Sequence, residues 1–117
     1  MMSPFWNDPF SMVYQAFQNL YPGKECECYF EPDLKADNGD KAYGLTNFCD
    51  DDDGEIQILV DPNVDIENAT EIFAHELAHV AVGYDAKHGP EWDAAFDAIL
   101  DEYNRIGDEL FGKQKPL

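Results

Sequence analysis

The sequence predicts a small α+β domain. The chain has 117 residues and a mass of 13.3 kDa, which suits one domain over residues 1–117. Apolar residues make up 44% of it, enough for one modest core. Apolar spacing typical of helices occurs near both ends, and strand-like segments lie between them. We therefore expect an ordered core over about residues 10–106. Along the chain it has an N-terminal helix, a three-stranded sheet, a metal-binding helix and a C-terminal helix.

The first helix is expected over residues 11–20. Aromatic and aliphatic side chains recur there at helical spacing, from Phe10 through Phe17 to Tyr21. Pro22 and Gly23 then end the helix.

Three strands are expected next, over residues 25–31, 42–48 and 55–60. The second and third flank an Asp-rich turn at 50–54, which predicts an antiparallel hairpin. We expect a three-stranded antiparallel sheet in which Ile56–Val60 is an edge strand.

Two more helices complete the prediction. The first runs over residues 69–82, with Asn68 and Glu71 as a capping box and Gly83 as the C-terminal cap. The second starts at Gly89-Pro90 and continues to about Ile106. The polar tail after Gly107 is expected to fray.

All three histidines of the chain lie close together in the sequence, as His75-Glu-Leu-Ala-His79 followed by His88. Residues four apart share one face of a helix, so His75 and His79 can bind one metal ion. His88 lies nine residues beyond His79, at the start of the last helix, and can complete three ligands. A catalytic zinc ion needs three protein ligands and one open position. Glu76, about 100° round the helix from His75, is placed to act as a general base.

Charge and cysteine content limit the function classes. Seven basic and 25 acidic residues give a net charge of −18, which makes direct nucleic-acid binding unfavourable. The N-terminal sequence lacks the pattern of a secretory signal, and no apolar run is long enough for a membrane span, so we expect a cytoplasmic protein. Cys26, Cys28 and Cys49 are an odd number and are expected to be buried, reduced thiols. Cys26 and Cys28 are not expected to bridge each other.

The histidine region resembles the SprT-like (Spartan-type) zinc metallopeptidases. The resemblance rests on His75-Glu-Leu-Ala-His79, then His88-Gly-Pro-Glu-Trp92. It implies a minimal zincin fold with His75, His79 and His88 as zinc ligands and Glu76 as the general base. The Cys-rich zinc ribbon frequent in that family is absent, because no cysteine follows Cys49. The acidic charge also differs from the basic surfaces of its DNA-directed members.

A second resemblance is to the regulator-cleaving proteases of the ImmA/IrrE type. Their helices carry a similar motif, but their third ligand is a glutamate from the following helix. Glu91 lies in that region, so it competes with His88 as the third ligand.

We therefore expect a zinc-dependent metallopeptidase that cleaves a protein substrate, and a basic protein is one candidate. The alternative is an acidic binding or inhibitory protein, stabilised by zinc, that mimics nucleic acid or resembles small phage factors. The first hypothesis requires Glu76, whereas the second rests on the acidic surface.

Overall fold

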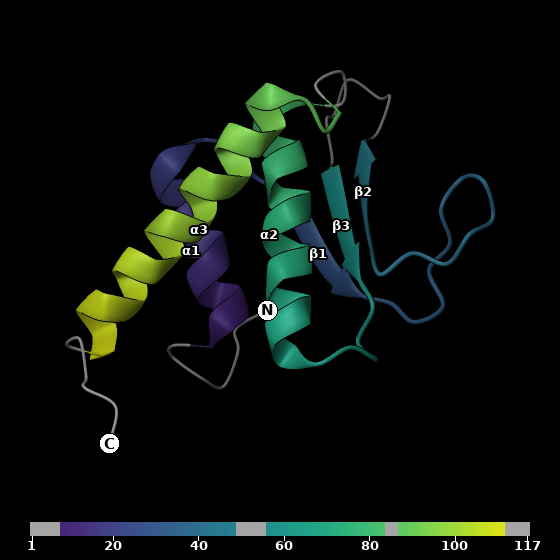
Figure 1. Cartoon of the computed structure of the whole chain (residues 1–117), viewed down its shortest axis with the longest axis horizontal. Coiled ribbons are helices and arrows are strands. Elements are labelled where there is room, and N and C mark those ends of the chain that lie inside the picture. The colour runs from purple at the N-terminus through teal and green to yellow at the C-terminus, as the bar shows by residue number, and fades with distance from the viewer. Residues whose placement is uncertain (1–7, 49–55, 84–86, 112–117) are drawn as a thin grey trace.

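The structure, a computed structural model, describes residues 8–48, 56–83 and 87–111. It has the α+β composition expected from the sequence, with three helices and one three-stranded sheet. The helices are α1 (Pro9–Leu20), α2 (Ile66–Val82) and α3 (Pro90–Phe111), and the strands are β1 (Glu27–Phe30), β2 (Gly44–Phe48) and β3 (Ile56–Val60). Helix α2 lies between the sheet and the other two helices (Figure 1).

The sheet is mixed, so the prediction of an antiparallel sheet is wrong in part. The strand order is β1-β3-β2; β2 pairs with β3 antiparallel, as the hairpin prediction required, but β1 pairs with β3 parallel. After β1 the chain makes a loop over residues 31–43 and returns as β2, which leaves one strand position vacant between β1 and β2. Strand β3 then fills the vacant position, which makes it the central strand rather than an edge.

The burial of β3 explains its central position. Ile58 is fully buried and Val60 is 4% exposed, whereas every residue of β1 is exposed. Since β3 is central, its inward-facing side chains pack against α2, and this contact needs apolar residues. The five residues Ile-Gln-Ile-Leu-Val meet this need better than either of the other strands.

Side-chain caps set where the helices begin. Helix α1 starts at Pro9 because the Asp8 carboxylate accepts a hydrogen bond from the Ser11 amide at 3.0 Å. Helix α2 starts at Ile66 because the Asp65 carboxylate accepts one from the Asn68 amide at 2.8 Å. Asn68 is therefore inside the helix, and its predicted capping role is wrong.

The C-terminal ends of the two last helices differ in how well they were predicted. Gly83 ends α2 with a positive φ of 91°, a conformation that favours glycine, as expected. Helix α3 continues to Phe111, past the point near Ile106 where fraying was expected. The turn at 50–54 lies outside the described residues.

The core lies between α2, the sheet and the other two helices. Phe17 from α1, Leu77 from α2 and Ile99 from α3 are fully buried. Aromatic rings of α1 extend this core, since Tyr14 stacks on Phe73 at a centroid distance of 6.4 Å. Helix α2 therefore packs against the sheet on one side and against α1 and α3 on the other, and these contacts fix the direction in which its other side chains point.

Candidate metal centre

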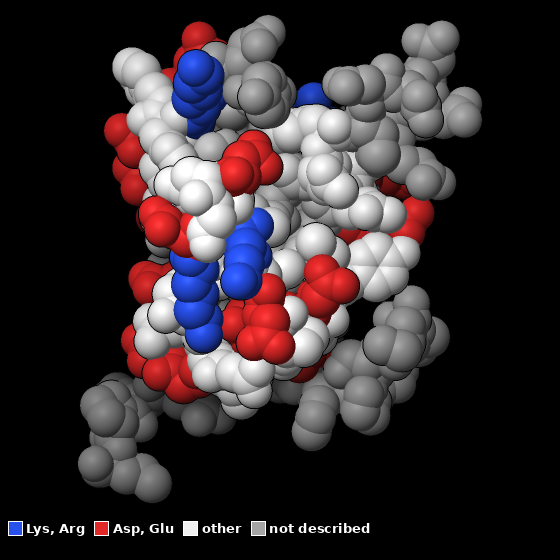
Figure 2. All heavy atoms as spheres, turned by 90° about the vertical axis from the view of Figure 1, so that its right-hand side faces the viewer, with Lys and Arg blue, Asp and Glu red and all other residues white. Residues whose placement is uncertain are grey.

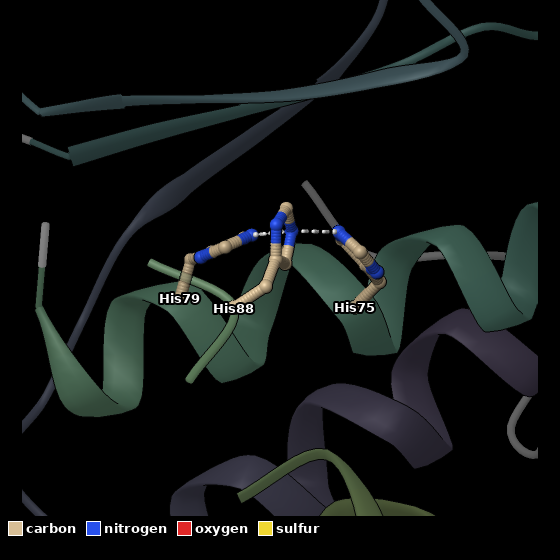
Figure 3. A group of neighbouring side chains, drawn as sticks. All are labelled: His75, His79 and His88. Atoms are coloured by element: carbon tan, nitrogen blue, oxygen red, sulfur yellow. Dashed lines mark hydrogen bonds between the residues drawn. The ribbon is translucent and has the colours of Figure 1, made fainter. Parts of the chain in front are cut away.

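The three histidine side chains converge on one point. His75 and His79 project from α2, and His88 reaches them from the segment before α3 (Figure 3). The His88 Nε2 atom lies 3.0 Å from the His79 Nε2 atom and 3.2 Å from the His75 Nε2 atom. These three residues could hold a metal ion, because one nitrogen from each lies within 4.8 Å of the others.

The environment of the imidazoles favours the neutral form that binds metals. Burial, and after it the neighbouring His75 and His88, lower the pKa of His79 to about 4. The pKa of His75 is also lowered, first by burial and then by His88. A neutral imidazole has a free lone pair for a metal, so little proton release is needed on binding.

Trp92 supports the histidines from α3. Its indole N–H donates a hydrogen bond of 3.2 Å to the main-chain carbonyl of His75. Its ring lies 4.6 Å from the ring of His75 and 4.9 Å from that of His88, measured between centroids. Trp92 is itself 8% exposed and stacks on Phe96 at 5.2 Å. The indole thus connects α2, which carries His75 and His79, to α3, which follows His88.

Glu76 lies beside the histidines and is buried, at 7% exposure. One of its carboxylate oxygens, Oε2, is 3.9 Å from the His75 Nε2 atom. Burial raises the pKa of the Glu76 carboxyl, while a hydrogen bond from Thr46 opposes this shift. A carboxylate whose pKa is raised towards neutrality is better suited to accept a proton in a reaction.

Strand β2 holds Glu76 in two ways that the sequence did not indicate. The Thr46 hydroxyl donates a hydrogen bond of 2.7 Å to the Glu76 Oε1 atom. Gly44 provides space, because a Cβ atom there would come within 2.4 Å of the Ile72 Cγ2 atom and 3.1 Å of the Glu76 Oε2 atom. Neither residue carries a local signal for this role, since about thirty positions separate them from Glu76.

Glu91, which the sequence offered as an alternative third ligand, lies outside the histidine cluster. Glu91 is exposed at the start of α3 and does not belong to the group of potential ligands found among the described residues. The structure therefore brings His88, and not Glu91, to the other two histidines.

Acidic side chains are scattered over the face of the molecule on the right of Figure 1, with uncharged and basic ones between them (Figure 2). Within the part of the chain that the structure describes, no helix has the length and apolarity needed to cross a membrane.

Comparisons with known proteins give no family assignment: no protein-family model, no curated protein and no solved structure matches this chain. The function must therefore be argued from the histidine centre and its surroundings.

Proposed function

We propose that this protein is a zinc-dependent peptidase of the minimal zincin type, with His75, His79 and His88 as ligands and Glu76 as general base. The observation that carries the proposal is the convergence of three imidazole nitrogens next to a buried carboxylate. A metal that only clips two helices together has no need of that carboxylate. A catalytic zinc site has three protein ligands and one open position, which matches the number of histidines in the cluster.

The spacing of the nitrogens suits zinc. With zinc–nitrogen distances near 2.05 Å and a tetrahedral angle, two ligand nitrogens are about 3.3 Å apart. The two shortest separations here are 3.0 and 3.2 Å. These distances also suit hydrogen bonds between neutral imidazoles.

The chemistry divides between the ion and the chain. When bound, zinc supplies a Lewis acid that polarises a carbonyl group and lowers the pKa of water. Glu76 accepts a proton from the attacking water through its carboxylate and later delivers it to the leaving amine. Thr46 and Gly44 keep that carboxylate in one position, which favours transfer along a single path.

We expect the substrate to bind along β2. The sequence predicted Ile56–Val60 as the edge strand, but that strand is central. Strand β2 is at the edge of the described sheet, packs beside α2 and contacts Glu76 through Thr46. An extended peptide added to this edge would pass next to the histidine centre.

The test replaces Glu76 by glutamine, which keeps its size and removes its basicity. Purified protein loaded with zinc is incubated with an unfolded, lysine-rich protein, and cleavage is followed by mass spectrometry. Glu76→Gln should keep bound zinc and lose about 10²- to 10⁴-fold in cleavage rate. Glu71→Gln, an exposed position on the same helix, serves as the matched control and should cleave normally. Equal rates for wild type and Glu76→Gln would refute the proposed mechanism.

The net charge of −18 favours a second candidate, an acidic protein that occupies a basic partner. In that case zinc is structural and Glu76→Gln binds the partner as tightly as wild type, with an affinity that falls steeply with salt. The scattered acidic side chains in Figure 2 support this candidate less than a continuous patch would. The buried Glu76 favours the peptidase.

A further inference from the structure

A second group of metal-binding atoms lies at the start of β1, on the opposite edge of the sheet from β2. The Sγ atoms of Cys26 and Cys28 are 3.8 Å apart. Cys28 is exposed and Cys26 is half-buried, so the expectation of two buried thiols is wrong. Residues two apart in an extended segment project to the same side, which brings the two sulfur atoms together. We call Cys26 and Cys28 the thiol pair.

The separation of the sulfur atoms is the one that a single metal ion imposes. With zinc–sulfur distances near 2.3 Å and a tetrahedral angle, two thiolates on one ion are about 3.8 Å apart. A disulfide needs about 2.05 Å, so its formation would require the two sulfur atoms to move much closer. The thiol pair, whose sulfur atoms are in hydrogen-bond contact, therefore already has a separation that one metal ion can bridge.

We propose that Cys26 and Cys28 form a second metal site, separate from the histidines, that chelates a soft, thiophilic cation such as zinc, cadmium or copper(I). Both cysteines bind as thiolates, each releasing its proton to solvent. The exposure of Cys28 leaves room for water or an external ligand to complete the coordination.

The two thiols of the pair differ in how easily they lose a proton. A hydrogen bond from Cys28 lowers the pKa of the Cys26 thiol, although burial acts against it, and Tyr14 contributes a second such bond. The Cys26 amide also donates to the Tyr14 hydroxyl at 3.4 Å, which ties the segment to α1. The same hydrogen bond, and after it burial, raise the pKa of the Cys28 thiol, so a bound cation must displace the proton of Cys28.

Charge around the pair favours the binding of a cation. Glu25, Glu27 and Glu31 adjoin it in the sequence, and the protein as a whole carries a net charge of −18. A negative potential attracts cations and repels anionic thiol reagents such as glutathione. The thiol pair does not share ligands with the histidine cluster, which is the one group of three or more potential ligands among the described residues.

The first experiment uses the unmodified protein and needs no substitution. Protein reduced with a phosphine is alkylated with iodoacetamide, with and without cadmium, and digested with trypsin. Cleavage after Lys24 and Lys35 places both cysteines of the pair on the peptide 25–35, while Cys49 falls on the peptide 42–87. Cadmium should block alkylation of peptide 25–35 and leave peptide 42–87 reactive, and a chelator should restore labelling. Equal labelling of peptide 25–35 with and without cadmium would overturn the proposal, as would protection that a chelator does not reverse.

The second experiment separates the thiol pair from the histidines. Cadmium is titrated into the protein while the ultraviolet charge-transfer band of cadmium thiolate is recorded. Imidazole ligands give no such band, so His75→Ala/His79→Ala should keep it, and Cys49→Ser should also keep it. Cys26→Ser/Cys28→Ser should lose the band while circular dichroism shows a folded protein. A band that survives in this double variant, or one that requires Cys49, would overturn the proposal.

Discussion

The two edge strands of the sheet differ in what they contact. Strand β2 lies against α2, and its Gly44 and Thr46 hold the carboxylate of Glu76. Strand β1 is exposed along its whole length and carries Cys28 of the thiol pair. In our proposals both edges carry metal-related chemistry, but of different kinds. The β2 edge presents desolvated groups in fixed positions, whereas the β1 edge presents a group in reach of solvent. This contrast predicts that substitutions on β2 cost stability and that equivalent ones on β1 do not.

The largest effect is expected for Gly44→Val. The new Cβ atom would lie within 2.4 Å of Ile72 and 3.1 Å of the Glu76 carboxylate, so one of these side chains must move. Overpacking of this kind lowers the free energy of unfolding by about 1–3 kcal/mol. Urea titration of the metal-free protein measures it.

The matched control for Gly44→Val is Cys28→Val on β1, at an exposed position of the same sheet. Its free energy of unfolding should stay within about 0.5 kcal/mol of wild type. If the two variants are equally stable, the two edges do not differ in packing as described.

A smaller effect is expected for Thr46→Val, which keeps the shape of the side chain and removes its hydroxyl. The Glu76 carboxylate then loses the 2.7 Å hydrogen bond that opposes the effect of burial on its pKa. The free energy of unfolding should fall by about 1 kcal/mol, because the hydroxyl is only partly buried. Thr46→Ser, which restores the donor, should recover most of that loss in the same urea titration. A loss in Thr46→Ser, which lacks the methyl group, with none in Thr46→Val would mean that the methyl group, and not the hydroxyl, supports Glu76.

The difference between the two edges also marks how far the sequence could predict this protein. The approximate positions of the helices and strands could be predicted from apolar spacing. The proximity of His75 and His79 could be predicted from helix geometry alone. The order of the strands could not be predicted, because the alternation of side chains within a strand indicates which face is buried and not which strands lie next to it. The segment Ile56–Val60 was the available sign that β3 is central, since it has more apolar residues than either of the other strands.

The candidate site shows the same limit. His88 could be expected near the other histidines because few residues separate it from α2. Thr46 and Gly44 reach Glu76 only after β2 has been placed next to α2, and that placement depends on the whole sheet. The contact between the Cys26 and Cys28 sulfur atoms was missed for a different reason. Spacing puts them on one side of the chain, but it does not give their separation.

The pH dependence of the metal-free protein tests whether the histidine centre is desolvated. His79 has a pKa of about 4 in the folded protein, below its ordinary value of 6.5. As pH falls from 6.5 to 4, the unfolded chain gains a proton at this residue and the folded protein does not, so His79 reduces stability over that range. Glu76 acts in the opposite direction, because its pKa is raised by burial.

The comparison must therefore be between wild type and His79→Ala, each unfolded in urea with a chelator present. The free energy of unfolding of wild type should decline relative to that of His79→Ala as pH falls through this range. Cys28→Val, on the exposed edge, should follow the wild-type profile. Parallel profiles for wild type and His79→Ala would show that the imidazole is as well solvated in the folded protein as in the unfolded chain, and the contrast between the two edges would then rest on packing alone.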